Sequence, residues 1–237
     1  ISKVGTQPII GTQINFRLND TIGLLPLFAM NETGYKRIIE LSSLSFLKNN
    51  ELLEPHVTFE EIYKKSEGVA LFSGTVFGLF GKLFDKGKFS EIDEAYAKLK
   101  SIYEDSFYLE IQRHNDQNEI SFEKYNLKKS SEFEIPLIAT NETFYINRDT
   151  HEAHDALICI KNKTYVNEKK RLRFSNHHYF KNDKEMSELF SDIPEALENN
   201  YNFPYRCCFK PLSSKPILPN ISSDKSGNAD DILKKDS

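Results

Sequence analysis

The sequence predicts an α/β fold, because short apolar segments typical of buried strands alternate with longer segments of helical periodicity. The clearest example is a pair of apolar runs, residues 107–111 and 135–139, separated by a polar segment of helical length. This spacing predicts two buried parallel strands joined by a crossover helix. Hydrophobic periodicity leaves open whether the strands form an open sheet or a barrel.

Both apolar runs end in polar side chains, the first at Arg113 and His114 and the second at residues 140–142. Because the carboxyl ends of parallel strands lie at one edge of a sheet, we expect these groups on the same rim. We therefore look for a functional site at this rim.

Length and composition suggest one large domain followed by an irregular tail, since 237 residues with 39% hydrophobic content bury a sizeable core. The formal charge of −4 excludes a strongly basic nucleic-acid-binding fold. Three cysteines without CxxC spacing predict reduced thiols in a cytoplasmic protein. We find no secretory signal and no apolar stretch long enough for a membrane span. The chain begins with Ile1, and we expect it to be an internal fragment of a longer one.

The first elements are predicted from changes in hydrophobic period. Residues 8–16 and 24–29 are expected to be strands, and Asn31 is expected to cap a helix that ends near residue 47. Thr58, followed by Glu61, has the spacing of a capping box. It predicts a short helix over residues 59–65, which Gly68 ends before a strand at residues 69–73.

Glycines recur in the next segment, at Gly74, Gly78, Gly81 and Gly87, but their spacing matches neither the dinucleotide-binding motif nor the P-loop. We interpret them as tight turns around a short amphipathic helix, in preference to a phosphate-binding loop. Ser90 is expected to cap the following helix, which leads into the strand at residue 107.

Two further patterns have alternative interpretations. His151 and His154 share a helix face but lack the HExxH arrangement, so we favour packing over metal binding. A basic run follows, and we interpret it as a solvated face with contact to a DNA backbone as the alternative. Its cations are Lys169, Lys170, Arg171 and Arg173.

The C-terminal part is expected to contain two helices and a linker. Asp183 is expected to cap the first helix, and Pro194 stands at a favourable first-turn position of the second. Residues 201–237 are rich in proline and serine, which predicts a linker. Residues 229–235 resemble the start of a further helix.

Several segments in this order resemble one protein family: QPIIGTQI, LFAMNETGYKRIIELSS, LFSGTVFGLFGKLFDKGK, FYLEIQRHNDQNE, IPLIATNETFYI, HEAHDALICI and LFSDIPEALENN. They resemble the N-terminal PHP (polymerase and histidinol phosphatase) domain of the bacterial replicative DNA polymerase III alpha subunits, the C-family polymerases. The resemblance covers nearly the whole chain. It implies a distorted (β/α)7 barrel over residues 1–200, with its first strand and HxH metal motif missing, and a linker at 201–237 leading into the polymerase palm domain.

Active members of this family hold a metal cluster in the barrel and use it as a phosphoesterase or a proofreading exonuclease. The resemblance places five of the corresponding positions in this sequence. His114 is retained and Glu142 replaces an aspartate, so these two are the expected residual ligands. Gln13, Leu24 and Phe144 stand where the family has a glutamate and two histidines. A site that has lost this many ligands is expected to bind metal weakly.

Three functions follow from the resemblance. We favour a catalytically silent module of a DNA polymerase, which supports the polymerase and docks the proofreading exonuclease subunit. An active 3′–5′ exonuclease is the alternative, and a stand-alone phosphoesterase is a remote third. For the whole polymerase, the resemblance implies Mg²⁺, DNA, the sliding clamp and the rest of the polymerase III holoenzyme, with no membrane. Only residual Zn²⁺ or Mn²⁺ is expected in the PHP site, and the polymerase aspartates lie outside the chain.

Overall fold

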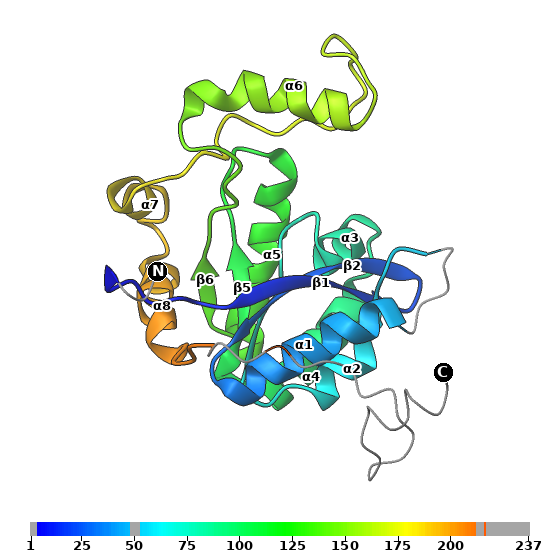
Figure 1. The fold of residues 1–237 in the computed structure, drawn as a ribbon, viewed down its shortest axis with the longest axis vertical. Helices are drawn as coiled ribbons and strands as arrows, with labels where there is room; N and C mark the ends of the chain where they lie inside the picture. The colour runs from blue at the N-terminus through cyan, green and yellow to red at the C-terminus, as the bar shows by residue number, and fades with distance from the viewer. Residues whose placement is uncertain (1–3, 48–52, 212–215, 217–237) are drawn as a thin grey trace, which may run out of the picture.

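Six strands form one mixed sheet in the computed structural model, which describes residues 4–47, 53–211 and 216 (Figure 1). Their order across the sheet is β3-β1-β2-β4-β5-β6, so β3 and β6 lie at the edges. The pairs β1/β3, β4/β5 and β5/β6 are parallel, and β1/β2 and β2/β4 are antiparallel. The strands are β1 (Gly11–Leu18), β2 (Thr21–Ala29), β3 (Val57–Thr58), β4 (Val69–Phe72), β5 (Phe107–Ile111) and β6 (Leu137–Ala139).

Eight α-helices lie within the described residues. They are α1 (Glu32–Leu47), α2 (Phe59–Lys64), α3 (Leu79–Asp85), α4 (Phe89–Tyr103), α5 (Gln117–Phe133), α6 (His151–Lys161), α7 (Asp183–Leu189) and α8 (Pro194–Arg206). Two 3-10 turns, η2 (Glu104–Ser106) and η3 (Arg148–Thr150), precede β5 and α6. The α/β alternation predicted from the sequence is therefore confirmed. The predicted unit of two parallel strands and a crossover helix is β5-α5-β6.

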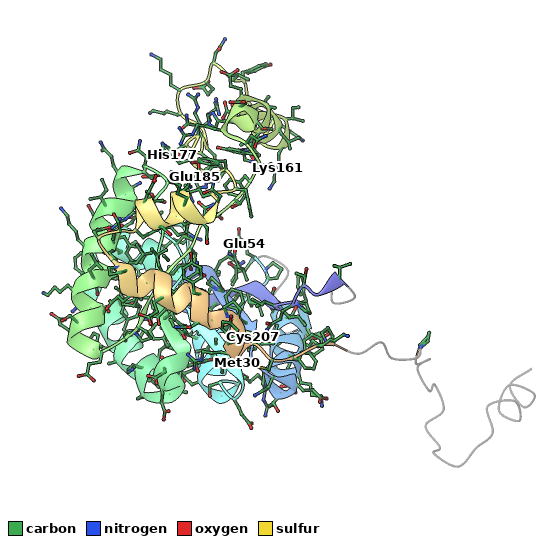
Figure 2. All side chains as sticks on the ribbon, turned by 90° about the vertical axis from the view of Figure 1, so that its left-hand side faces the viewer. Met30, Glu54, Lys161, His177, Glu185 and Cys207 are labelled. Atoms are coloured by element: carbon green, nitrogen blue, oxygen red, sulfur yellow. The ribbon has the colours of Figure 1, made fainter. Side chains whose placement is uncertain are left out.

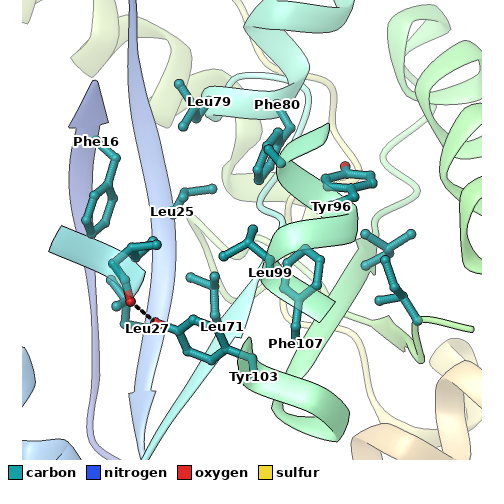
Figure 3. Packing of buried hydrophobic residues seen from close by; sticks show 14 of the residues in the cluster. Phe16, Leu25, Leu27, Leu71, Leu79, Phe80, Tyr96, Leu99, Tyr103 and Phe107 are labelled. Atoms are coloured by element: carbon teal, nitrogen blue, oxygen red, sulfur yellow. Dashed lines mark hydrogen bonds between the residues drawn. The ribbon is translucent and has the colours of Figure 1, made fainter. Parts of the chain in front are cut away.

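The core is divided between the two faces of the sheet. On one face, β1, β2, β4 and β5 pack against helices α1 to α5, with the fully buried Phe16, Phe80, Tyr96 and Phe107 among the contacts (Figure 3). On the other face, a smaller aromatic cluster surrounds Phe203 of α8. Every residue of β4, β5 and β6 is buried, which is typical of strands covered on both faces.

Some of the predicted N-cap residues agree with the structure and others do not. Asn31 caps α1 as predicted, since its Oδ1 accepts a hydrogen bond from the Gly34 N–H at 2.9 Å. Thr58 is the N-cap residue of α2, as predicted, but its side chain makes no capping hydrogen bond, so the predicted capping box does not form. The predicted cap at Ser90 is wrong, because Lys88 is the N-cap residue of α4. The Ser90 hydroxyl instead donates to Glu94, because the helix already begins at Phe89.

The starts of α7, α8 and β1 can also be compared with their predicted positions. Asn182, and not Asp183, caps α7, because its side chain accepts from the Glu185 N–H at 3.0 Å. The prediction of Pro194 in the first turn of α8 is confirmed. Strand β1 begins at Gly11, three residues later than predicted.

The segment predicted as a linker begins inside a helix. Helix α8 continues to Arg206, and Phe203 and Cys207 are buried against the sheet. The Cys208 N–H donates to the Met30 carbonyl at 3.0 Å, which ties the end of α8 to the end of β2 (Figure 2 labels the neighbouring Cys207 and Met30). Apart from residues 201–211 and 216, the predicted linker and its helix at 229–235 lie outside the described residues.

We predict that Gly34→Ala destabilises the fold by at least about 2 kcal/mol. A Cβ at Gly34 would lie 1.8 Å from the Gly68 carbonyl oxygen, so α1 would have to move away from the turn that precedes β4. Urea unfolding measures the effect. Gly87→Ala is the control, because a Cβ there meets no atom within 4 Å and only the positive φ of 70° adds strain, roughly 1 kcal/mol. Equal losses in both variants would contradict the predicted clash.

Candidate functional site

The carboxyl ends of β5 and β6 lie side by side, as their parallel pairing requires. The Thr140 N–H donates to the Ile111 carbonyl at 3.0 Å, so the segments that follow the two strands leave the sheet together. His114 follows β5 and Glu142 follows β6. The structure therefore places these two predicted residues on one rim.

A buried carboxylate lies just below this rim. Oε1 of Glu110, in β5, accepts hydrogen bonds from Gln112 Nε2 at 3.0 Å and from the Thr140 hydroxyl, while Oε2 has no hydrogen-bond partner among the described residues. Burial raises the pKa of Glu110, and the hydrogen bonds from Thr140 and Gln112 oppose this rise. Glu110 is thus a buried carboxyl group with a raised pKa inside the sheet, and its role was not predicted from the sequence.

His114 is oriented by a single carboxylate. Glu119, in the first turn of α5, accepts from the His114 backbone N–H through Oε2 at 2.6 Å, and its Oε1 lies 2.8 Å from Nδ1. The same Glu119 belongs to the capping box that begins α5 at Asp116. Nε2 of His114 is buried and has no hydrogen-bond partner among the described residues. This nitrogen is the one ring atom of His114 left for another ligand.

A second histidine, His178, covers the ring of His114. The two rings stack with centroids 3.8 Å apart and an interplanar angle of 3°. His178 Nδ1 lies 3.1 Å from the backbone oxygen of Glu142 and 4.0 Å from its carboxylate. Burial lowers the pKa of His178 to about 4, and the adjacent His114 contributes to the shift. The neutral ring therefore packs here at physiological pH.

Glu142 faces the same group of side chains. Burial raises the pKa of Glu142, with His114 opposing and Glu119 adding to the rise. The rim therefore joins three carboxylates to two imidazoles, those of Glu110, Glu119, Glu142, His114 and His178. Because two of the carboxylates have raised pKa values, the group holds protons more readily than separate surface side chains would.

Phe144 lies between two histidines. Its ring stacks on His178, with centroids 5.0 Å apart, and on His154 of α6, with centroids 5.1 Å apart. With His114 this makes a continuous stack of four rings. An aromatic hydrocarbon thus occupies the position at which a histidine was expected from the family resemblance.

Arg113 fixes the rim to the helices beside it. Its guanidinium donates to both carboxylate oxygens of Asp192 at 2.6 and 2.8 Å and to Glu123 of α5 at 2.6 and 3.0 Å. These two acidic partners raise the pKa of Arg113 above its usual value. Next to it, a cavity of about 450 Å³ is lined by residues that include Arg113, Glu119 and His177.

Gln13 and Leu24 lie on other strands of the sheet. In the antiparallel pair β1/β2, Gln13 is opposite Pro26 and Leu24 is opposite Asn15, so alternation puts Gln13 and Leu24 on one face. Strand β4 separates them from β5. Gly74, which follows β4, lies close to β2, because a Cβ there would lie 3.3 Å from the Leu24 carbonyl oxygen.

The basic run is only partly available to a ligand. Arg171 and Asp155 form a buried bidentate ion pair at 2.5 and 2.6 Å, with each side chain 6% exposed. The pair lowers the pKa of Asp155. Arg173 is 3.9 Å from the same carboxylate, whereas Lys169 and Lys170 are exposed. A DNA backbone would therefore meet the two lysines and Arg173.

The donor set does not fit a multi-metal cluster. Across residues 4–47, 53–211 and 216, no group of three or more His, Cys, Asp or Glu side chains has an arrangement that could hold a metal ion. Such a cluster needs several carboxylate and imidazole ligands, whereas Gln13, Leu24 and Phe144 supply none. Within the same residues, no helix combines the length and the hydrophobicity needed to cross a membrane.

Sequence reasoning missed three members of the rim. Glu110 is the lone charged residue in a buried five-residue strand, and Glu119 follows Asp116 at capping-box spacing. Both signals were present in the sequence. His178 had no such signal, because only the tertiary fold brings it from 64 residues downstream onto His114.

Comparison with known proteins gives one consistent result. Residues 1–114 match the family described as PHP domain. The chain is 35% identical over 235 residues to a protein of Rickettsia bellii named DNA polymerase III subunit alpha, which covers 99% of this chain and 20% of that protein.

Proteins of the same name from Caulobacter vibrioides and Borreliella burgdorferi are 34% identical over 243 residues and 33% identical over 231 residues. These matches cover 97% and 92% of this chain and 21% and 20% of the relatives. The chain thus spans about a fifth of the length of the curated relatives that it matches.

We predict that His178 makes stability depend on pH. The pKa of His178 is lowered to about 4 in the folded protein from about 6.5 in the unfolded chain. Its contribution to the free energy of unfolding is therefore fully present above about pH 6.5. It is lost as the pH falls toward 4, because the unfolded chain then binds a proton that the folded chain does not. The expected loss is roughly 1–3 kcal/mol. Urea unfolding at several pH values should show a smaller dependence in His178→Gln, and parallel curves for variant and wild type would contradict the assignment.

Proposed function

Since this chain contains a PHP domain and is homologous to the N-terminal region of the DNA polymerase III alpha subunit, we propose that it is part of a bacterial replicative DNA polymerase. In this proposal the domain is catalytically silent. It supports the polymerase body and docks the proofreading exonuclease subunit. The whole polymerase would use Mg²⁺, act on DNA in the cytoplasm and assemble with the sliding clamp and the other holoenzyme subunits.

The observation that carries the silent assignment is the position of Phe144. Its ring is stacked between His178 and His154, so the place of an expected ligand is filled by a group with no donor atom. Gln13 offers a neutral amide, and Leu24 offers no polar atom. Residual binding of Zn²⁺ or Mn²⁺ would depend on His114 and Glu142, and two ligands hold a metal weakly.

The barrel and the domain limits are also proposals. The sheet has edges at β3 and β6, and a strand outside this chain would close it into the distorted (β/α)7 barrel that the resemblance implies. We place the PHP domain at residues 1–200 and the connection to the palm domain at 201–237. The packing of Phe203 and Cys207 onto the sheet suggests that this connection starts from a fixed point on the domain.

One observation favours the alternative, a metal-dependent 3′–5′ exonuclease or phosphoesterase. Nε2 of His114 and Oε2 of Glu110 are both buried and lack hydrogen-bond partners among the described residues. Unpaired buried polar atoms cost free energy and are commonly satisfied by a water molecule or an ion. In this alternative His114 and Glu142 would bind the metal, and Glu110 would be close to it.

The deciding experiment measures bound metal and nuclease activity together in the full-length polymerase. Elemental analysis gives the metal content, and digestion of a single-stranded 3′ end with added Mn²⁺ or Zn²⁺ gives the activity. We expect substoichiometric metal and no cleavage that depends on His114. Near-stoichiometric metal, with cleavage abolished by His114→Ala, would replace the proposed function with the nuclease alternative.

We predict that restoring the missing ligands increases metal affinity. The triple variant Gln13→Glu, Leu24→His, Phe144→His should bind Mn²⁺ or Zn²⁺ at least about tenfold more tightly than the wild type, since loss of a group that only orients a metal ligand already lowers affinity by about tenfold or more. Isothermal titration with each metal measures it. The triple variant combined with His114→Ala should lose the gain. Unchanged affinity in the triple variant would show that these positions did not disable the site.

The exposed end of the basic run allows a test of the alternative to a solvated face, which is contact with a DNA backbone. If both side chains touch phosphates, Lys169→Glu with Lys170→Glu should reduce the slope of log affinity against log salt by about 1.8 for the full polymerase. Lys124→Glu with Lys128→Glu on α5 is the charge-matched control and should leave the slope unchanged. A slope unchanged in the first pair as well would assign the lysines to a solvated face.

A further inference from the structure

Helix α6 and its flanking segments form an arm that projects from the domain. The arm comprises residues 146–174, and in Figures 1 and 2 it extends beyond the sheet and the helices that cover it. Among the described helices and strands, α6 makes its extensive contacts with η3, the turn that precedes it. Most of the surface of α6 is therefore free of the domain core.

Helix α6 has large apolar side chains on both its buried and its exposed side, unlike an ordinary surface helix. At 100° per residue, Asp155, Ile158 and Cys159 lie on one side of the helix and are buried. Leu157 and Ile160 lie on the opposite side and are 62% and 74% exposed. A helix that buries a carboxylate and exposes two large aliphatic side chains is poorly suited to a free surface.

Polar contacts stabilise the conformation of the arm, and Leu157 and Ile160 take no part in them. The buried ion pair of Asp155 and Arg171 joins α6 to the returning segment. His151 Nε2 is 2.9 Å from the Phe174 carbonyl, and the Thr164 N–H donates to Cys159 at 3.0 Å. The outward aliphatic face is thus presented by a preformed support, which reduces the entropic cost of binding.

The rest of the arm also exposes large apolar side chains to solvent. Further large apolar side chains are exposed along it, namely Ile146, Tyr165, Val166 and Leu172. Exposed apolar residues concentrated in one segment and bordered by charges are typical of an interaction surface.

The net charge of the arm indicates which kind of partner would bind it. Residues 146–174 contain seven Lys and Arg residues and four Asp and Glu residues, a formal charge of +3, whereas the whole chain has −4. Lys161 and Lys163 directly follow the apolar face, and both are exposed. A complementary partner therefore combines aliphatic and acidic side chains.

We propose that the outward face of the arm docks an acidic amphipathic segment of a partner subunit. Leu157 and Ile160 would pack against its apolar side, while Lys161 and Lys163 would pair with its carboxylates. A nucleic acid is the less suitable ligand, because aliphatic side chains neither stack on bases nor bind phosphates, and because Arg171 is already paired with Asp155. The inference rests on the proposed function, in that the domain docks a partner subunit.

The test measures binding of the proofreading exonuclease subunit to the full-length polymerase by isothermal titration. Leu157→Ser with Ile160→Ser should weaken binding about tenfold or more, as expected when central apolar contacts are removed. Lys161→Glu with Lys163→Glu should weaken binding and reduce its salt dependence. Ile39→Ser with Phe46→Ser on α1 is the matched control, because both of these side chains are also large, apolar and exposed.

The outcomes separate this inference from the proposed function. If the exonuclease subunit binds the wild type and the Leu157/Ile160 variant equally, docking stands and the arm is excluded as its surface. If the wild type fails to bind the subunit, the proposed docking function fails and the inference fails with it. If the lysine variant loses affinity for a single-stranded oligonucleotide while subunit binding is unchanged, the arm is a nucleic-acid surface and the inference is overturned.

Discussion

The coverage of the sheet on both faces is the constraint on which the rest of this structure depends. Strands β4, β5 and β6 are buried throughout, so almost every side chain on them must be apolar. Polar chemistry is consequently displaced to the segments that follow the strands. Glu110 is the charged exception within these strands, and its raised pKa reflects the cost of keeping a carboxylate there.

The rim gathers carboxylates and imidazoles around the buried ring of His114. Glu119 orients His114 through two contacts, which resembles the way carboxylates orient metal-binding imidazoles. Beside it, the ring of Phe144 stacks between His178 and His154, so that aromatic contacts surround the imidazoles. In the proposed function, these side chains support a binding module and perform no catalysis.

The arm shows the opposite distribution of polarity. The core of the domain body is mainly apolar, whereas the arm buries the ion pair of Asp155 and Arg171 and exposes Leu157 and Ile160. A buried ion pair adds little net stability but makes the removal of one partner costly, so it favours one specific shape. In the proposed docking function, this shape offers the apolar face to a partner subunit.

The sequence by itself determined the α/β class and the β5-α5-β6 unit, because these depend on local hydrophobic periodicity. It also indicated the family, through the resemblance of several segments in the same order. It also placed His114 and Glu142 on one rim, since parallel strands end at the same edge. It did not place the caps of α4 and α7 correctly, because Lys88 and not Ser90 precedes α4, and because Asn182 and not Asp183 forms the cap bond of α7. Thr58 was placed correctly at the N-cap of α2, but its capping bond does not form.

Only the tertiary structure decided how distant segments meet. It stacked His178 on His114, inserted Phe144 between two histidines, paired Arg171 with Asp155 and turned the apolar side of α6 outward. Each of these contacts joins residues that are far apart in the chain or depends on which helix face meets the core. Such contacts carry no local signal, because the free energy that selects them comes from packing and desolvation in the assembled fold.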